Sequence, residues 1–205
     1  GLLSYVVLFG SLFVAPFFLE DERGLSIGSA GAALTALPIG IGIVAPVAGL
    51  FSDRLGARSL TVTGMVVSAL ALGLLATVHG TTALVILGLA LLGVGLGLFT
   101  PANNAAIMAA APRAQSGAAS GILNMTRGLG TSLGLSLTGL VFAAVAGSHA
   151  KAGLVADGFT AACLFLAVVA AAAALLAGLR GDPPLDVGSP WLRAGGRRMQ
   201  KRWLL

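Results

Sequence analysis

The sequence predicts an all-α integral membrane protein in which six transmembrane helices form one bundle. Only 9% of the 205 residues are charged and 57% are hydrophobic, whereas about a quarter of the residues in a water-soluble domain are charged. The mean hydropathy is +0.99. Several stretches without Asp, Glu, Lys or Arg also reach the roughly 20 residues that a helix needs to cross the hydrocarbon core. Such a chain cannot cover its own surface for water.

The uncharged stretches define the helices in order. They cover residues 1–19, 24–52, 59–112, 128–150 and 158–179. The third is too long for one helix, and the polar residues 79–82 divide it. The fourth extends back to about residue 116 if a helix tolerates Arg127. We therefore predict helices over about residues 1–19, 27–52, 59–78, 83–111, 116–147 and 156–179.

The composition changes after residue 180. Prolines at positions 183 and 184 stop the last helix. A basic stretch bracketed by Trp191 and Trp203 follows. We predict a disordered cytoplasmic tail over residues 181–205. The alternative is a segment that lies on anionic lipid, with its tryptophans in the interface.

Basic residues predict the orientation, because Lys and Arg are retained on the cytoplasmic side. One set of alternate loops holds nine basic residues, and the other holds only Arg23 and Lys151. The nine are Arg54, Arg58, Arg113, Arg180, Arg193, Arg197, Arg198, Lys201 and Arg202. We predict a multi-pass protein of the plasma membrane with both ends in the cytoplasm and the acidic residues 20–22 outside.

Several classes of function lack the residues that they need. Cys163 is the only cysteine, and no Cys/His cluster offers metal ligands. Half of the basic residues follow Gly178, in a tail rather than on a nucleic-acid-binding stripe. No Ser/His/Asp set or phosphate-binding loop is present. We expect no catalytic site, metal, cofactor or nucleic-acid partner, and an intramembrane enzyme is the weakest alternative.

The most informative stretch is residues 49–58, which contain the predicted loop of about six residues between the second and third helices. Gly56 permits a turn of the backbone. Asp53 can accept from the first amides of the next helix or pair with an arginine. A charge network of this kind can lock neighbouring helices. The simpler alternative is that Arg54 and Arg58 only retain the loop in the cytoplasm.

This stretch resembles the cytoplasmic loop motif of the major facilitator superfamily of transporters. Six residues match the motif: Gly49, Ser52, Asp53, Arg54, Gly56 and Arg58. Phe51 replaces a Leu and Ala57 replaces a basic residue, so the copy resembles the weaker one in the second half of such proteins. The resemblance implies a cytoplasmic gate at Gly49, Asp53, Arg54, Gly56 and Arg58 rather than substrate binding. It also implies two inverted three-helix repeats.

Later segments are similar to the fourteen-helix drug:proton antiporter branch of that superfamily. They are residues 93–101, 115–121 and 124–130. The resemblance covers about residues 1–180. Together with the start at Gly1, which is not a methionine, it leads us to expect the C-terminal half of a longer permease.

Four polar residues of the fourth and fifth helices are predicted to lie at similar depth. Asn103 and Asn104 precede the turn near Arg113, and Asn124 and Arg127 follow it, all about 15 to 20 Å along their helices. An unpaired Arg in hydrocarbon costs at least about 2.5 to 3.5 kcal/mol. We therefore expect a polar layer that faces a cavity, or an Arg127 that reaches toward the cytoplasm.

The first helix offers two candidate faces to a substrate. Tyr5, Phe9, Phe13 and Phe17 repeat at every fourth position. These rings either face lipid or, as the family resemblance implies, line the central cavity, where they stack on a flat apolar or cationic substrate. The polar side offers Ser4 and Ser11 instead. Glycine pairs spaced by four residues predict close helix packing at 93/97, 117/121 and 130/134.

The family resemblance implies transport of small amphipathic molecules by alternating access, as proton-coupled drug efflux. The expected partners are the substrate, the lipid bilayer and the missing N-terminal half. No Asp or Glu lies well inside a predicted span, so the proton-carrying carboxylate is expected in that other half. Alternatives are a six-helix protein that assembles into its own channel or transporter, and a nonfunctional fragment.

Overall fold

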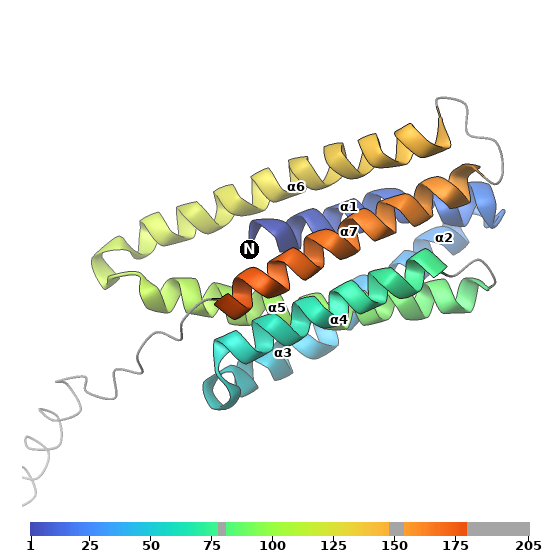
Figure 1. Cartoon of the computed structure of the whole chain (residues 1–205). Helices are drawn as coiled ribbons and strands as arrows, with labels where there is room; N and C mark the ends of the chain where they lie inside the picture. The colour runs from blue at the N-terminus through green and yellow to red at the C-terminus, as the bar shows by residue number, and fades with distance from the viewer. Residues whose placement is uncertain (78–80, 148–153, 180–205) are drawn as a thin grey trace, which may run out of the picture.

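The computed structural model describes residues 1–77, 81–147 and 154–179, and it describes side chains for all of these except residues 51–55 and 113. The described part is an all-α bundle that contains no β-strand and has six helical spans long and apolar enough to cross a membrane (Figure 1). The elements are α1 (Leu2–Phe17), η1 (Phe18–Glu22), α2 (Ile27–Leu34), α3 (Ala36–Leu55), α4 (Ala57–Thr77), α5 (Thr82–Ala110), η2 (Arg113–Gln115), α6 (Ser116–Ala146) and α7 (Leu154–Leu179). The predicted tail lies outside the described residues.

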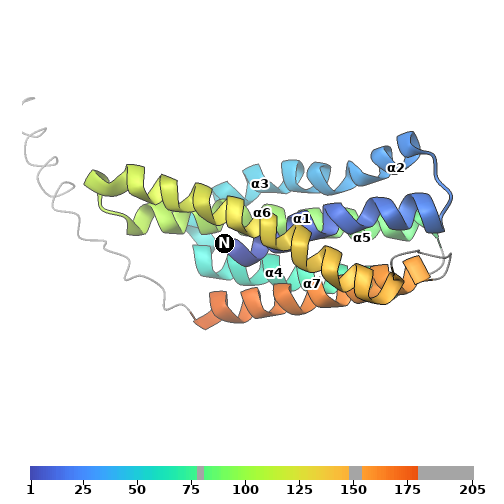
Figure 2. The same cartoon turned by 90° about the horizontal axis from the view of Figure 1, so that it is seen from above.

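The packing order relates the first three spans to the last three. Helix α1 packs on α6 and α7, α5 packs on α3 and α4, and α4 packs on α7 (Figures 1 and 2). The first span of each set therefore contacts the second and third spans of the other set. This exchange is the arrangement expected of two three-helix repeats related by a pseudo-twofold axis.

Large apolar side chains fill the space between these helices. The fully buried ones include Leu37 of α3, Met65 and Leu72 of α4, and Leu92 and Leu96 of α5. At the other side of the bundle, the rings of Phe18 and Phe159 stack with centroids 4.3 Å apart. The chain thus has one continuous core.

The first span is longer than predicted and changes character near its end. Pro16 has no N–H to donate within α1. Residues Phe18–Glu22 then form one turn of π-helix, closed by the Arg23 N–H that donates to the Phe18 carbonyl at 3.1 Å. The helical run ends at Gly24, whose φ is +64°. The acidic residues 20–22 are therefore helical and do not form the loop that the sequence predicts.

The second span is not the single helix that the sequence predicts. It breaks at Thr35, whose N–H donates to the Ala32 carbonyl at 3.2 Å instead of continuing the α-helical pattern. Pro38 follows three residues later and cannot donate to the Leu34 carbonyl. After the break, α3 continues to Leu55. The missing backbone donor explains why one apolar stretch forms two helices.

The connection between α3 and α4 is one residue long, not the loop of about six residues that the sequence predicts. Only Gly56 is non-helical, and its φ of +79° lies in the left-handed region. A side chain at this φ is strained, whereas glycine adopts it readily. Asp53 and Arg54 therefore belong to the last turn of α3, and Arg58 belongs to the first turn of α4.

Glycines allow close approach at two of the three predicted pairs. A methyl group on Gly93 or Gly97 of α5 would come within 3.1 Å of the α3 backbone, at Gly40 and Ile41 respectively. One on Gly130 of α6 would come within 2.6 Å of Tyr5 Cβ. Gly117 and Gly121 have nothing within 4 Å. The packing role predicted for Gly117 and Gly121 is therefore absent among the described residues.

Candidate functional site

The first predicted site, the gate motif, lies where α3 meets α4. Gly49 of α3 is exposed, and a Cβ added there would meet no atom of another segment within 4 Å. The side chains of Asp53 and Arg54 lie outside the described residues, so the predicted gate contact stays a prediction. Arg58 donates from Nη2 to the backbone carbonyl of Gly178, near the end of α7. The negative end of a helix favours a cation at this place.

The four residues of the predicted polar layer are only partly brought together. Asn103 is buried at 4% exposure, and Asn104 is half-buried. Asn124 and Arg127 are exposed. Among the residues that the structure describes, no hydrogen bond joins any two of the four. Helices α5 and α6 make few contacts with each other.

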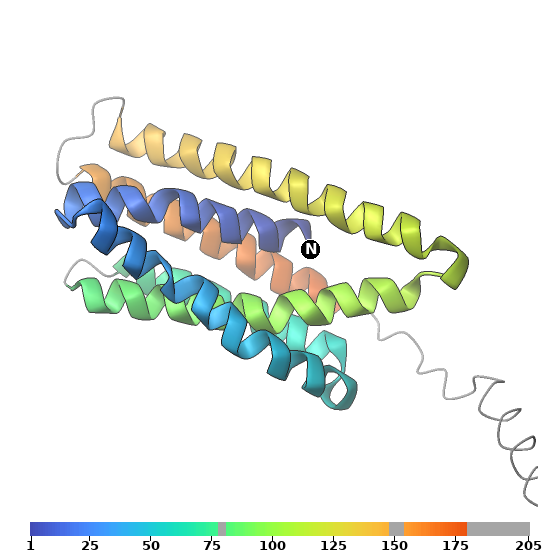
Figure 3. The ribbon, with the colours of Figure 1, turned by 180° about the vertical axis from the view of Figure 1, so that it is seen from behind.

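Helix α1 is what places these residues at the same level. A methyl group on Gly1 would come within 3.2 Å of Asn103 Nδ2 of α5 and 3.5 Å of Thr126 Cγ2 of α6. Arg127, the next residue of α6, reaches Tyr5 one turn farther along α1. The beginning of α1 lies between α5 and α6 (Figure 3), so Asn103 and Arg127 approach it from two different helices.

The central contact of this region joins Arg127 to Tyr5. Two guanidinium nitrogens, Nε and Nη2, donate to Tyr5 Oη at 3.3 Å and 3.2 Å. The guanidinium carbon also lies 5.4 Å from the centroid of the Tyr5 ring, within the range of a cation–π interaction. The sequence places these residues in two separate candidate groups. Their pairing could not be read from it, because 122 residues separate them.

Three aromatic residues of α1, Tyr5, Phe13 and Phe17, lie beside α6. The Tyr5 side chain is only 9% exposed. The rings of Phe13 and Phe17 meet edge to face at 5.4 Å, and Phe17 lies 5.6 Å from Phe142 of α6. Phe9 is half-exposed. Phe17 is 39% exposed, and Phe9 lies one helical turn beyond Tyr5 on α1.

The second candidate face of α1 does not line an open surface. Ser4 and Ser11 are both 3% exposed. Their hydroxyls donate back to their own helix, Ser4 to the Gly1 carbonyl at 2.7 Å and Ser11 to the Val7 carbonyl at 2.8 Å. Both hydroxyls are thus buried and bonded within α1 in this structure, and a role of these serines in a substrate path stays a prediction.

A cavity that the sequence did not indicate lies beside Asn103. Its volume is about 290 Å³, and it opens among α1, α4, α5 and α7. Its walls are formed by Gly1, Leu2, Leu3, Thr61, Phe99, Asn103, Ala173, Leu176 and Ala177. Phe99 and Asn103 are four residues apart on one face of α5, and this spacing was the available signal.

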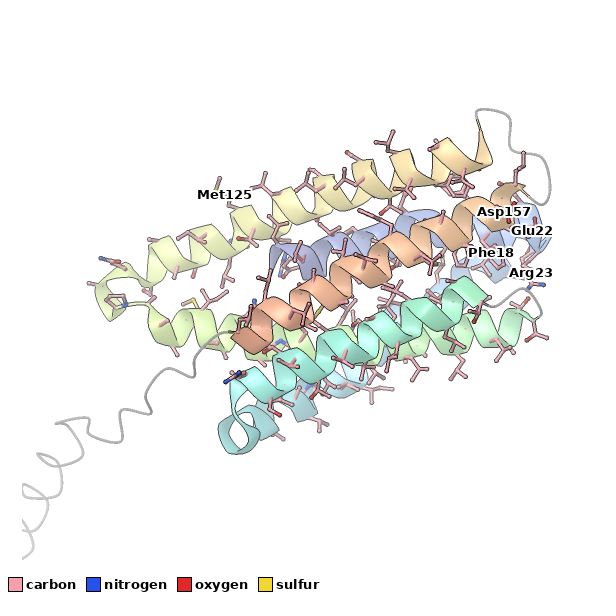
Figure 4. The ribbon with its side chains drawn as sticks, in the orientation of Figure 1. Phe18, Glu22, Arg23, Met125 and Asp157 are labelled. Carbon is pink, nitrogen blue, oxygen red and sulfur yellow. The ribbon has the colours of Figure 1, made fainter. Side chains whose placement is uncertain are left out.

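Charged side chains gather at the opposite end of the bundle. Figure 4 shows Glu22, Arg23 and Asp157 together there, beside Phe18. The Arg23 guanidinium lies 5.3 Å from the centroid of the Phe18 ring. Within the described part of the chain, no group of three or more His, Cys, Asp or Glu residues could hold a metal ion.

Two spans leave one face of the bundle largely uncovered. Only 22% of the apolar window is buried in the span Ile27–Leu50 and in α6, against 39 to 50% in the other four. Both spans contain glycines at which an added Cβ would meet no atom of another segment within 4 Å: Gly28, Gly31, Gly42, Gly49, Gly117, Gly121 and Gly128. Between α1 and this second span lies an apolar hollow of about 350 Å³.

Comparison with known proteins identifies the family of this bundle. Residues 1–203 match the model of the Major Facilitator Superfamily. The uncharacterized transporter YebQ of Escherichia coli is 33% identical over 82% of this chain and 35% of its own length. The multidrug resistance protein Stp of Mycobacterium tuberculosis is 34% identical over 68% of this chain and 26% of its length. The riboflavin transporter RibZ of Clostridioides difficile is 32% identical over 70% of this chain and 32% of its length.

These relatives are longer than the chain, which spans about a quarter to a third of their length. The six-helix bundle with its exchanged packing and the match over nearly all of its residues agree. The chain therefore belongs to the Major Facilitator Superfamily.

Proposed function

We propose that this chain is the C-terminal six-helix half of a multidrug exporter of the fourteen-helix drug:proton antiporter branch. The half rocks against an N-terminal half and exposes a shared substrate site to each side of the membrane in turn. Small amphipathic molecules are the substrates. The observation that carries the proposal is the uncovered face formed by the α2–α3 span and α6.

This face suits a second helical bundle better than it suits lipid alone. Open glycines let another backbone approach closely. The polar side chains of Asn124 and Arg127 are exposed on α6. Polar groups in hydrocarbon are costly, and they are normally turned to a bundle interior or a wet cavity. The greater length of the relatives leaves room for the covering half.

The substrate and the proton-carrying group are considered separately. One relative is named a multidrug resistance protein and another a riboflavin transporter. The relatives therefore do not specify the substrate of this chain. In the described residues, the carboxylates Glu20, Asp21, Glu22 and Asp157 all lie at the ends of spans. The group that carries the proton is accordingly assigned to the other half.

The plasma membrane is the proposed location, with both ends of the chain in the cytoplasm. The support is the excess of basic residues in one set of loops. The α3–α4 connection, which contains the matched motif, then lies on the cytoplasmic side. There Asp53 and Arg54 would stabilise the closed state. In the intact transporter, Asp53→Asn should reduce transport without preventing insertion, and unchanged efflux would remove the gate role.

The test of the function is dye efflux from bacterial cells that lack their own exporters. Cells with the intact gene product should accumulate less of an amphipathic dye, and a protonophore should abolish the difference. The 205-residue chain alone should insert without exporting the dye. Efflux by the chain alone would favour a self-assembling six-helix transporter. No efflux in either case would contradict drug export.

A further inference from the structure

We propose that Arg127, held in place by Tyr5, forms a subsite that binds an anionic oxygen of a flat aromatic substrate. The inference deepens the proposed function and rests on it, because the substrate must reach the uncovered face. The subsite consists of Arg127 on α6, together with Tyr5 and Phe9 on α1.

The position of Arg127 gives the first argument. It lies eleven residues after Ser116, or about 16 Å along α6, within the helix that crosses the membrane. An arginine at such depth needs polar partners. Tyr5 supplies one neutral acceptor, with Oη bonds of 3.3 Å and 3.2 Å, and the face of its ring.

The remaining donors give the second argument. A guanidinium carries five N–H groups, and two of them are used by Tyr5. Among the described residues no carboxylate pairs with Arg127, because the described carboxylates lie at the opposite end of α1 or at the start of α7 (Figure 4). Three N–H groups and a full positive charge are therefore left for an oxygen ligand, and Arg127 is exposed.

The sides of α6 show which way this charge faces. Exposed apolar residues, Ile122, Leu129, Leu133 and Leu140, recur on one flank. In the first half of α6, the exposed polar residues Ser120, Asn124 and Arg127 lie on the other flank, whereas the exposed Ser132 and Ser136 farther along lie near the apolar flank. Met125 points away from the bundle (Figure 4). Leucine is at no disadvantage in lipid whereas asparagine and arginine are, so the polar flank faces the space beside α1.

Phe9 supplies the apolar part of the subsite. It follows Tyr5 by four residues, which places it on the same side of α1 about 6 Å farther along. Phe9 is half-exposed, whereas Tyr5, which contacts Arg127 and lies against Gly130 of α6, is 9% exposed. An aromatic body can therefore lie on Phe9 while its oxygen reaches Arg127.

The pairing also disfavours cationic substrates at this place. A cation that stacks on Tyr5 would need the ring surface that Arg127 already occupies. It would also meet the arginine charge at short range, where the low dielectric strengthens repulsion. Discrimination between anionic and cationic forms of one ring system is thus the measurable property of the subsite.

The experiment measures efflux of two xanthene dyes, anionic fluorescein and cationic rhodamine 123, by the intact transporter in cells. Arg127→Gln should raise the KM for fluorescein roughly tenfold, as expected for the loss of a charge-assisted hydrogen bond, and should leave rhodamine efflux equal or faster. Arg127→Lys should retain part of the fluorescein efflux. Tyr5→Phe should raise the fluorescein KM severalfold, because the guanidinium loses its acceptor.

The control is Arg23→Gln, which removes the same charge at the opposite end of the bundle and should leave the dye ratio unchanged. Membrane levels of each variant are measured by immunoblot. An equal fall for both dyes in Arg127→Gln would overturn the subsite and would indicate a structural pair or a carboxylate from the other half. Wild-type efflux of rhodamine alone would overturn the subsite and leave drug export intact. Efflux of neither dye would contradict both proposals.

Discussion

Individual residues matter most where two helices come within backbone contact. Gly93 of α5 lies against Leu37 and Gly40 of α3, whereas Gly73 of α4 has nothing within 4 Å. The same added methyl group therefore meets a backbone at one position and open space at the other. Side-chain volume, rather than helix propensity, decides the effect at the first position.

Gly93→Ala should lower the free energy of unfolding by about 1 to 3 kcal/mol, the usual cost of overpacking. Gly73→Ala should raise it by up to about 1 kcal/mol, because alanine is the better helix former. The measurement is the thermal unfolding midpoint of each purified variant in detergent. Equal effects of the two substitutions would contradict the close α3–α5 contact.

Arg58 acts on a helix end 120 residues away. Arg58→Ala should release the last turn of α7, because the Gly178 carbonyl loses its donor, at a cost of about 1 kcal/mol. Hydrogen exchange should become faster in peptides that cover residues 172–179. The matched control is Ser59→Ala, an exposed neighbour, which should leave this exchange unchanged. Unaltered exchange in the Arg58 variant would remove the contact.

At the scale of elements, the helices end where a backbone group changes rather than where hydropathy falls. Pro38 splits the second apolar stretch at Thr35, and Gly56 alone reverses the chain between α3 and α4. Hydropathy placed all six spans correctly because spans of bilayer length leave little freedom. It missed the break and overestimated the loop, since neither depends on apolar content.

Gly56→Ala should destabilise the α3–α4 turn by about 1 to 2 kcal/mol, because a Cβ is unfavourable at a φ of +79°. Gly56→Asn should cost less, since asparagine adopts left-handed conformations more readily. The yield of folded protein in detergent and the unfolding midpoint give the comparison. A tolerance of alanine equal to that of asparagine would contradict the left-handed turn.

The whole molecule makes a prediction about orientation. Asp21 and Ser59 are exposed and stand at opposite ends of the bundle, whereas Cys163 is 2% exposed. Asp21→Cys should react with a membrane-impermeant maleimide in intact cells. Ser59→Cys should react only after the membrane is opened. The unchanged chain, which has only Cys163, serves as the unlabelled control, and the reverse pattern would invert the proposed topology.

For the candidate site, the sequence indicated several residues but not the contacts that they make. The candidate residues Arg127, Tyr5, Phe9 and Asn103 could be chosen from the sequence, because polar or aromatic side chains within long apolar stretches are conspicuous. Their partners could not. The sequence kept Arg127 in a layer with Asn103, Asn104 and Asn124, and it offered Ser4 and Ser11 as a substrate face. The structure shows both serines buried and bonded to carbonyls of α1.

By itself, the sequence determined that this protein lies in a membrane, how many helices cross it and roughly where each begins and ends. Length and hydropathy suffice for that, because the bilayer imposes one thickness on every span. Only the tertiary structure decided which helices exchange partners, that Arg127 bonds to Tyr5, and that α6 and the α2–α3 span stay uncovered. Inside a membrane most helix faces are apolar, so packing geometry contributes more than hydropathy to which faces meet.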